Sequence, residues 1–212
     1  MRLSRRLLLL IIGLTLSAPA IAQRQTFAIA GFTLGDRINP EDLESFTCGP
    51  SPWTGAEREC RKKKAAKQVS ASTSLFLDNH DRLQLLSQKF DNIPMTQKSA
   101  EEVIAAHSNR FALEPRRMIR QIGADKVIVA AWGDLQLQEI DIQTRLATIQ
   151  GRQGDELLLV DLINNIEKSA LDVLPIYQIK GSNGAIWTFY IRSGALGWAM
   201  ARIISRGEAS PR

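Results

Sequence analysis

The chain has 212 residues, an apolar content of 44% and a formal net charge of +5. The length and composition suit one globular domain or two small ones, with a core that needs no metal to form. The positive charge does not indicate a nucleic-acid-binding protein, because it is concentrated in two short stretches and not spread over a broad basic face.

Residues 1–22 have the features of a signal peptide: a basic start, "MRLSRR", then the apolar stretch "LLLLIIGLTL", then small residues at Ala20 and Ala22. We expect cleavage after Ala22 by the Sec route, although "SRRLLL" also loosely fits the twin-arginine signal. The apolar stretch is about half the length of a membrane-spanning helix. The mature chain is therefore predicted to be soluble and periplasmic or secreted, with a formal charge of only +2.

Residues 23–93 are predicted to form an N-terminal unit with a short helix and a β-hairpin. Asn39 and Pro40 are a typical N-cap and first-turn pair for a helix over residues 39–46. Alternating apolar residues in "VSASTSLFLDNHDRLQLLSQKF" predict two strands that turn at Asn79 and His80. A loop rich in Pro and Gly separates the helix from the hairpin and carries both cysteines of the chain.

Cys48 and Cys60 are expected to form a disulfide, because an exported protein meets an oxidising compartment. Their spacing excludes a C-x-x-C redox motif, and two Cys with two His are too few for a structural zinc site, which uses about four ligands. In the chain-entropy model, closing a loop of this size contributes about 3 kcal/mol. We expect a structural disulfide and neither a metal nor another cofactor.

A basic stretch follows Cys60 and is the only concentrated positive charge of the mature chain. One interpretation is a contact for anionic lipid head groups or acidic polymers, with each charge contributing up to about 1 kcal/mol near a membrane. The other, which is favoured, is a solvated edge strand whose lysines prevent edge-to-edge aggregation. The candidate polyanion contacts are Arg61, Lys62, Lys63, Lys64 and Lys67.

Residues 94–142 are predicted to form a helix followed by three strands. Ser99 and Glu102 have the spacing of a capping box, and Pro115 ends the helical pattern. The stretch "RRMIRQIGADKVIVAAWGDLQLQEI" predicts three strands, with "GADK" and "GD" as the turns between them.

Residues 143–212 repeat this pattern. Asp155 is the predicted N-cap of a helix that ends before Pro175, and "IYQIKGSNGAIWTFYIRSGALGWAMARII" predicts three further strands with Gly-containing turns. The first turns of the two units, at Gly123 and Gly181, are 58 residues apart, which favours a duplication. We therefore expect an α+β fold with tandem α-βββ units, a degenerate N-terminal unit and one disulfide, in one compact domain.

The strand "GAIWTFYI" has large side chains at alternate positions on both faces. This pattern indicates either a central strand covered on both sides, which is favoured, or a strand with a core side and a binding side. In the second interpretation, an exposed aromatic platform would stack on a glycan or a peptide. The candidate platform residues are Tyr177, Tyr190 and Trp198.

No catalytic motif is found in the chain. A G-x-S-x-G nucleophile elbow and a phosphate-binding glycine loop are both absent. The only histidines have structural interpretations, because His107 lies on the inner face of a predicted helix and His80 lies in a predicted turn. We therefore expect the protein not to be an enzyme, and a secreted hydrolase is the weakest alternative.

These features predict an exported, non-enzymatic binding module that acts as an envelope accessory or binds a protein or peptide. An exposed sheet edge or the aromatic strand would make the contact, and β-augmentation is one physical route to affinity. The alternative is a binder of an anionic membrane surface or a polyanion through the basic stretch. The expected partner is an unidentified envelope protein or peptide, and no nucleic acid.

Overall fold

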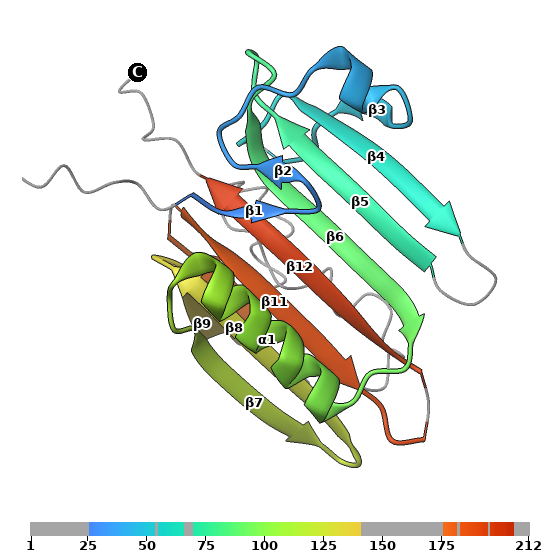
Figure 1. Ribbon diagram of the computed structural model, residues 1–212, viewed down its shortest axis with the longest axis vertical. Helices are drawn as coiled ribbons and strands as arrows, with labels where there is room; N and C mark the ends of the chain where they lie inside the picture. Colours follow the sequence, from blue (N-terminus) through green and yellow to red (C-terminus); the bar gives the residue numbers. More distant parts are fainter. Residues whose placement is uncertain are drawn as a thin grey trace, which may run out of the picture.

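Figure 1 shows the fold, a computed structural model that describes residues 26–53, 55–65, 70–140, 176–181, 183–194 and 196–205. The fold of this part of the chain is mainly β, with one α-helix and one 3-10 helix. In chain order the elements are β1 (Ala28–Ile29), β2 (Phe32–Thr33), η1 (Pro40–Leu43), β3 (Thr47–Pro50), β4 (Arg58–Ala65), β5 (Ser70–Leu77), β6 (Leu83–Ile93), α1 (Gln97–Phe111), β7 (Arg116–Ile122), β8 (Asp125–Gly133), β9 (Gln136–Ile140), β10 (Ile176–Lys180), β11 (Asn183–Ile191) and β12 (Gly197–Ser205).

Eight strands form one antiparallel sheet in the order β3-β4-β5-β6-β12-β11-β8-β7. Chain neighbours such as β5 and β6 pair as hairpins, and the predicted hairpin over residues 69–90 is confirmed. In contrast, β12 near the end of the described chain inserts between β6 and β11. Two further pairs, β1–β2 and β9–β10, stand outside this sheet.

Two glycines mark the bend between the β8–β11 pair of the main sheet and the separate β9–β10 pair. Gly133 and Gly181 have positive φ angles of 86° and 116°, which L residues with a side chain rarely adopt. Across the bend, the Asp134 N–H donates to the Asn183 carbonyl oxygen at 3.0 Å, and the Asn183 N–H donates to Asp134 Oδ1 at 2.6 Å. Beyond the bend, the segment that follows β8 and the segment that precedes β11 pair with each other as β9 and β10.

The prediction of an α+β fold made of tandem α-βββ units is wrong. The strands expected after Pro115 and Pro175 do form, but not as two local meanders: β7, β8, β11 and β12 join the large sheet, whereas β9 and β10 pair with each other. The turns explain the difference: Gly123 lies in a true hairpin between β7 and β8, whereas Gly181 joins β10 to β11, which do not pair with each other. The helix predicted after Asp155 lies outside the described residues.

The helix and the β1–β2 hairpin cover the same face of the sheet, the helix over β8 and β11 and the hairpin over β6 and β12 (Figure 1). Phe27 and Phe111 meet edge to face with their ring centres 5.0 Å apart, so they join the hairpin end to the helix end of this core. Trp132 is fully buried beneath them, with its ring centre 5.7 Å from that of Phe111.

Helix α1 begins earlier than its predicted cap. Thr96 is the N-cap residue, and it exchanges hydrogen bonds with Ser99 in a capping box. Ser99 therefore stands three residues after the cap and is not the cap itself. In the N-terminal unit, the helix expected over residues 39–46 is shorter than predicted and forms the 3-10 turn η1.

Strand β11 is a central strand. All its residues from Gly184 to Tyr190 are buried, and so are the residues from Gly197 to Ile204 on the neighbouring strand β12. Because successive side chains of a strand point to opposite faces, both faces of the sheet are covered here. The interpretation of "GAIWTFYI" as a central strand with two covered sides is confirmed.

Candidate functional site

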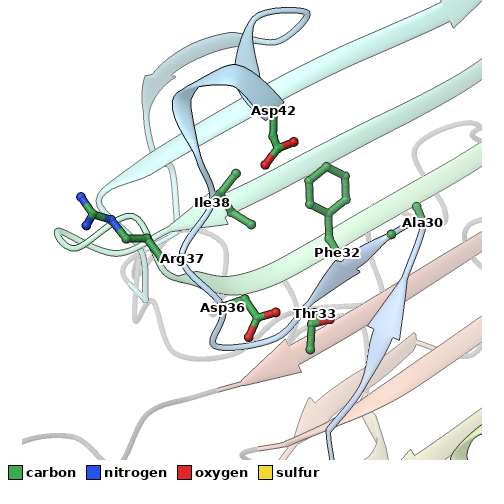
Figure 2. A pocket seen from close by; sticks show the side chains of 8 residues that line it. Ala30, Phe32, Thr33, Asp36, Arg37, Ile38 and Asp42 are labelled. Carbon is green, nitrogen blue, oxygen red and sulfur yellow. The ribbon is translucent and has the colours of Figure 1, made fainter.

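An open pocket of about 360 Å³ lies between the β1–β2 hairpin and the segment that follows it (Figure 2). None of the residues predicted to form a functional site takes part in it. The lining residues are Ala30, Gly31, Phe32, Thr33, Asp36, Arg37, Ile38 and Asp42.

A tight turn shapes the wall of the pocket that carries Phe32. Ala30 and Gly31 connect β1 to β2 and have φ angles of 55° and 86°. A two-residue hairpin turn with positive φ at both positions matches the right-handed twist of its strands. The turn therefore returns the chain directly, with Phe32 beside the segment that carries the charged residues (Figure 2).

The opposite wall is fixed by backbone hydrogen bonds to the start of β6. The Leu83 N–H donates to the Asp36 carbonyl oxygen at 2.9 Å, and the Ile38 N–H donates to the Asp81 carbonyl oxygen at the same distance. Ile38 is only 5% exposed and anchors the segment to the core. The position of Asp36 is thus determined by ordered backbone on both sides.

The charge of the pocket is negative. In Figure 2 the carboxylates of Asp36 and Asp42 lie on the side of the segment that faces Phe32, whereas the Arg37 side chain extends away from them. Both carboxylates are exposed to solvent. A ligand in the pocket therefore meets two anionic groups and one aromatic ring, without a cation from Arg37 between them.

A lysine of the same protein already packs against the aromatic side of this region. Phe32 contacts Phe46 edge to face, with ring centres 6.2 Å apart. Lys62 Nζ lies 5.5 Å from the centre of the Phe46 ring and donates a hydrogen bond to Ser45 Oγ at 2.6 Å. The ring next to the pocket thus holds a cation, as expected from the negative face of its π system.

These side chains suit an organic cation better than a metal ion. Hard divalent cations take six or more oxygen ligands, or keep several waters. In the part of the chain that the structure describes, no three His, Cys, Asp or Glu side chains gather closely enough to hold a metal. An ammonium or guanidinium group needs only the carboxylates and the ring that are present.

Arg61 and Lys62 of the basic stretch have different partners within the protein. Arg61 donates to both carboxylate oxygens of Glu59 at 2.5 and 2.6 Å, whereas its neighbour Lys62 contacts Ser45 and Phe46. Both residues belong to β4, where successive side chains point to opposite faces. Of the other candidates, Lys63 and Lys64 pair in register with Ser72 and Ala71, and Lys67 lies outside the described residues.

The predicted disulfide is confirmed. Cys48 and Cys60 are bonded and stand directly opposite each other in the β3–β4 pair. Cys60 is fully buried, and Trp53 in the enclosed loop packs edge to face against Phe76, with ring centres 6.1 Å apart. An intramolecular disulfide of this kind is consistent with an extracytoplasmic protein.

The rings of Tyr190 and Trp198 stack on each other, with centres 5.7 Å apart. They are only 6% and 7% exposed, so they offer little surface to a ligand. The Tyr190 hydroxyl also donates to Asp125 Oδ2 at 2.5 Å. The third candidate, Tyr177, lies in β10, opposite Glu139 of β9.

Both histidines lie where the sequence placed them. His80 is in the β5–β6 turn, where its backbone N–H donates to Asp78 Oδ1 at 2.8 Å. The His107 ring packs against Trp187 at 5.1 Å, and its Nδ1 lies 2.9 Å from the Val103 carbonyl oxygen of the same helix. The two imidazoles are therefore parts of a turn and of an aromatic cluster.

No motif in the sequence identifies the pocket. The available signal was the density of turn residues in "AGFTLGDRINPED", where Gly35 and Pro40 each directly precede an acidic residue. That pattern predicts turns, but it does not tell which carboxylates converge. The convergence depends on where the segment attaches to β6.

In comparisons with known proteins, no family model, curated protein or solved structure matches this chain. Within the described residues, no helix has both the length and the apolar character needed to span a membrane. The chemistry of the pocket is therefore the basis on which a function can be assigned.

Proposed function

We propose that this protein is an exported, non-enzymatic binding module that recognises a protein or peptide by taking a cationic side chain of the partner into the pocket. The observation that carries this proposal is the convergence of Asp36 and Asp42 on an open pocket beside Phe32 (Figure 2). A Lys or Arg side chain of a partner has the positive charge and the hydrogen-bond donors that these carboxylates and the ring attract.

The energetics favour a recognition site over a tight small-molecule site. Each exposed ion pair contributes up to about 1 kcal/mol, and a cation at an exposed aromatic face contributes about 0.5–1 kcal/mol. Every 1.4 kcal/mol that these interactions contribute makes a cationic side chain bind about tenfold more tightly than a neutral one. The pocket thus selects the residue type, while the surrounding surface of the partner supplies the remaining affinity.

Export is the second element of the proposal. The basic, apolar and small-residue regions of residues 1–22 support a signal peptide, and the Cys48–Cys60 disulfide supports an oxidising compartment. The expected location is the periplasm or the extracellular medium. In that location the module would act as an envelope accessory.

A binder of anionic membranes or polyanions remains the alternative proposal, and it has less support. Two of its candidate cations, Arg61 and Lys62, already have partners within the protein and use opposite faces of β4. A polyanion would have to compete with Glu59 for one and with Ser45 for the other.

The test uses the mature, disulfide-bonded protein and a fluorescent peptide in which one Arg is flanked by Gly and Ser. Binding is measured by anisotropy against the same peptide with citrulline, which keeps the shape and removes the charge. We expect the Arg peptide to bind at least about tenfold more tightly, and the double variant Asp36→Asn, Asp42→Asn to remove most of that preference.

Glu44→Gln is the matched control, because Glu44 is an exposed carboxylate of the same segment that does not line the pocket. Circular dichroism and thermal unfolding verify that each variant is folded. Equal binding of the Arg and citrulline peptides, or an equal loss in Glu44→Gln and in the double variant, would refute the pocket as the recognition site.

A further inference from the structure

Strand β7 is one edge of the large sheet. It pairs with β8 over its full length, from Arg116 opposite Ala131 to Ile122 opposite Asp125. No other described strand pairs with β7, and its outer side is free of other described elements in Figure 1. Every second residue of such an edge directs its backbone N–H and C=O groups outward, where they can pair with an added strand.

The side chains of this edge are basic, with an apolar residue at the centre. Three of the seven residues are arginines, Arg116, Arg117 and Arg120, and none is acidic. All three are exposed. Ile119 is 49% exposed and is one of only two large exposed hydrophobic side chains in the described chain. Prevention of aggregation explains the arginines but not an exposed Ile between them.

Contacts with the rest of the protein hold the guanidinium groups of Arg116 and Arg117 in place. Arg117 Nη1 forms an ion pair of 2.7 Å with Glu101 on α1. Arg116 Nη1 donates to the Leu135 carbonyl oxygen at 2.9 Å. A guanidinium has five N–H donors, so each group keeps donors for a further acceptor. The positive charges are thus positioned along the edge before any partner arrives.

The two edges of the sheet differ in their capacity to accept a strand. The opposite edge strand, β3, has only four residues, includes Pro50 and is linked to β4 by the disulfide. Pro lacks a backbone donor, and a short edge offers few bonds. The β7 edge is longer and has no Pro.

A second copy of the chain fits the β7 edge poorly. Two β7 strands side by side would bring six arginines together, and like charges that face each other across a strand pair destabilise it. A carboxylate-rich strand reverses this interaction at every arginine. The charge of the edge therefore rejects self-association and selects an acidic partner.

We propose that β7 is a docking strand for an extended, acidic segment of another protein, which extends the sheet by β-augmentation. Main-chain hydrogen bonds to β7 supply affinity, carboxylates of the segment pair with the arginines, and an apolar side chain of the segment covers Ile119. This surface is separate from the pocket, so either proposal stands if the other fails.

The test uses the mature protein and a labelled peptide of alternating Glu and Val, with a peptide of alternating Lys and Val as the charge-reversed control. Fluorescence anisotropy measures affinity, and hydrogen exchange of the protein locates the peptide. We expect the acidic peptide to bind at least about tenfold more tightly than the basic one. We also expect amides of β7 to become protected while those of β3 and β4 do not.

Arg120→Glu is expected to weaken binding of the acidic peptide by about tenfold and to strengthen binding of the basic one. Arg82→Glu makes the same charge change at an exposed residue of the β5–β6 turn, and it should change either affinity less than about twofold. Equal effects of the two variants, or binding without protection of β7, would show general charge attraction and overturn the proposal. Protection of β7 by self-association without peptide would also overturn it.

Discussion

Strands β11 and β12 at the centre of the sheet differ from strands β3 and β4 at its edge in what surrounds them. The central strands are buried on both faces over almost their whole length. All four residues of β3 are exposed, and β3 touches only one neighbouring strand. The centre is therefore held by packing on both faces, whereas β3 is held by its pairing with β4 and by the disulfide to that strand.

The same kind of substitution should therefore change stability by different amounts in the two regions. A buried strand has no room for an added atom, because protein interiors are packed as densely as organic crystals. An exposed edge tolerates an added atom but loses order once its cross-link is removed.

The largest effect is expected from Gly184→Ala in β11. A Cβ at this position would overlap the Trp132 carbonyl oxygen and would lie 2.5 Å from Leu135 Cγ. Because the first of these contacts is with backbone, the neighbour cannot rotate away. We expect the free energy of unfolding to fall by about 4 kcal/mol, measured by urea denaturation.

Gly49→Ala in β3 is the matched control, since a Cβ there has no atom within 4 Å. Its effect on the free energy of unfolding should stay within about 0.5 kcal/mol. Similar losses in the two variants would show that the centre of the sheet is not the tightly packed region.

The second largest effect is expected from replacement of Cys48 and Cys60 by Ala. Removal of a cross-link over this loop should lower the free energy of unfolding by about 3 kcal/mol. Hydrogen exchange should quicken in β3 and β4 and stay slow in β11. A reducing agent gives the same result with the native protein and no change with the double variant. Uniform acceleration across the sheet would contradict the local role of the bond.

The individual strands could be predicted from the sequence, because alternation of apolar residues is a local signal. The pairing of strands that are distant in the chain could not. Strand β12, which lies in the stretch "GALGWAMARII", was expected beside β11 and does lie there. Its second neighbour, β6, was not expected. Ala199 and Ala201 lie opposite Phe90 and Gln88 in the β12–β6 pair, and nothing in the local sequence predicts these partners. Register between distant strands follows from burial of a shared core face.

The candidate site divides in the same way. The disulfide was predictable because only one pairing of two cysteines exists. The basic stretch could be identified in the sequence from its consecutive Lys and Arg residues. Only its pairing as strand β4 shows that the side chains of Arg61 and Lys62 lie on different faces of the sheet. The pocket was not predictable, since Asp36 and Asp42 have no motif in common. Their proximity comes from the turn geometry and from the bonds between the 36–38 segment and the β5–β6 hairpin.

The smallest effect concerns the contact that joins the start of β8 to the end of β11. Asp125 Oδ2 accepts the Tyr190 hydroxyl at 2.5 Å, and Oδ1 accepts the Ser193 backbone N–H at 2.9 Å. These hydrogen bonds, chiefly that of Tyr190, and the nearby charge of Arg192 lower the pKa of Asp125, against the opposing effect of burial. The folded state thus favours the carboxylate form.

A lowered pKa in the folded state means that the carboxylate stabilises the fold at pH values above its unfolded pKa, near the usual value of 3.8. This stabilisation is lost as the pH falls through the lower, folded value. Tyr190→Phe should decrease the free energy of unfolding by about 1 kcal/mol at neutral pH, and the difference from the native protein should shrink in acid. Urea denaturation from pH 7 to pH 2 measures both values.

Asp125→Asn separates this contact from simple packing at the centre of the sheet. If the hydroxyl acts through the carboxylate, Tyr190→Phe should cost less in the Asp125→Asn background than in the native protein, and a double-mutant cycle measures that difference. The pH dependence should weaken in both single variants. An equal cost of Tyr190→Phe in both backgrounds, unchanged between neutral and acid pH, would show that the loss comes from the repacked ring against Trp198. In that case burial alone would stabilise this end of β11, as it does at Gly184.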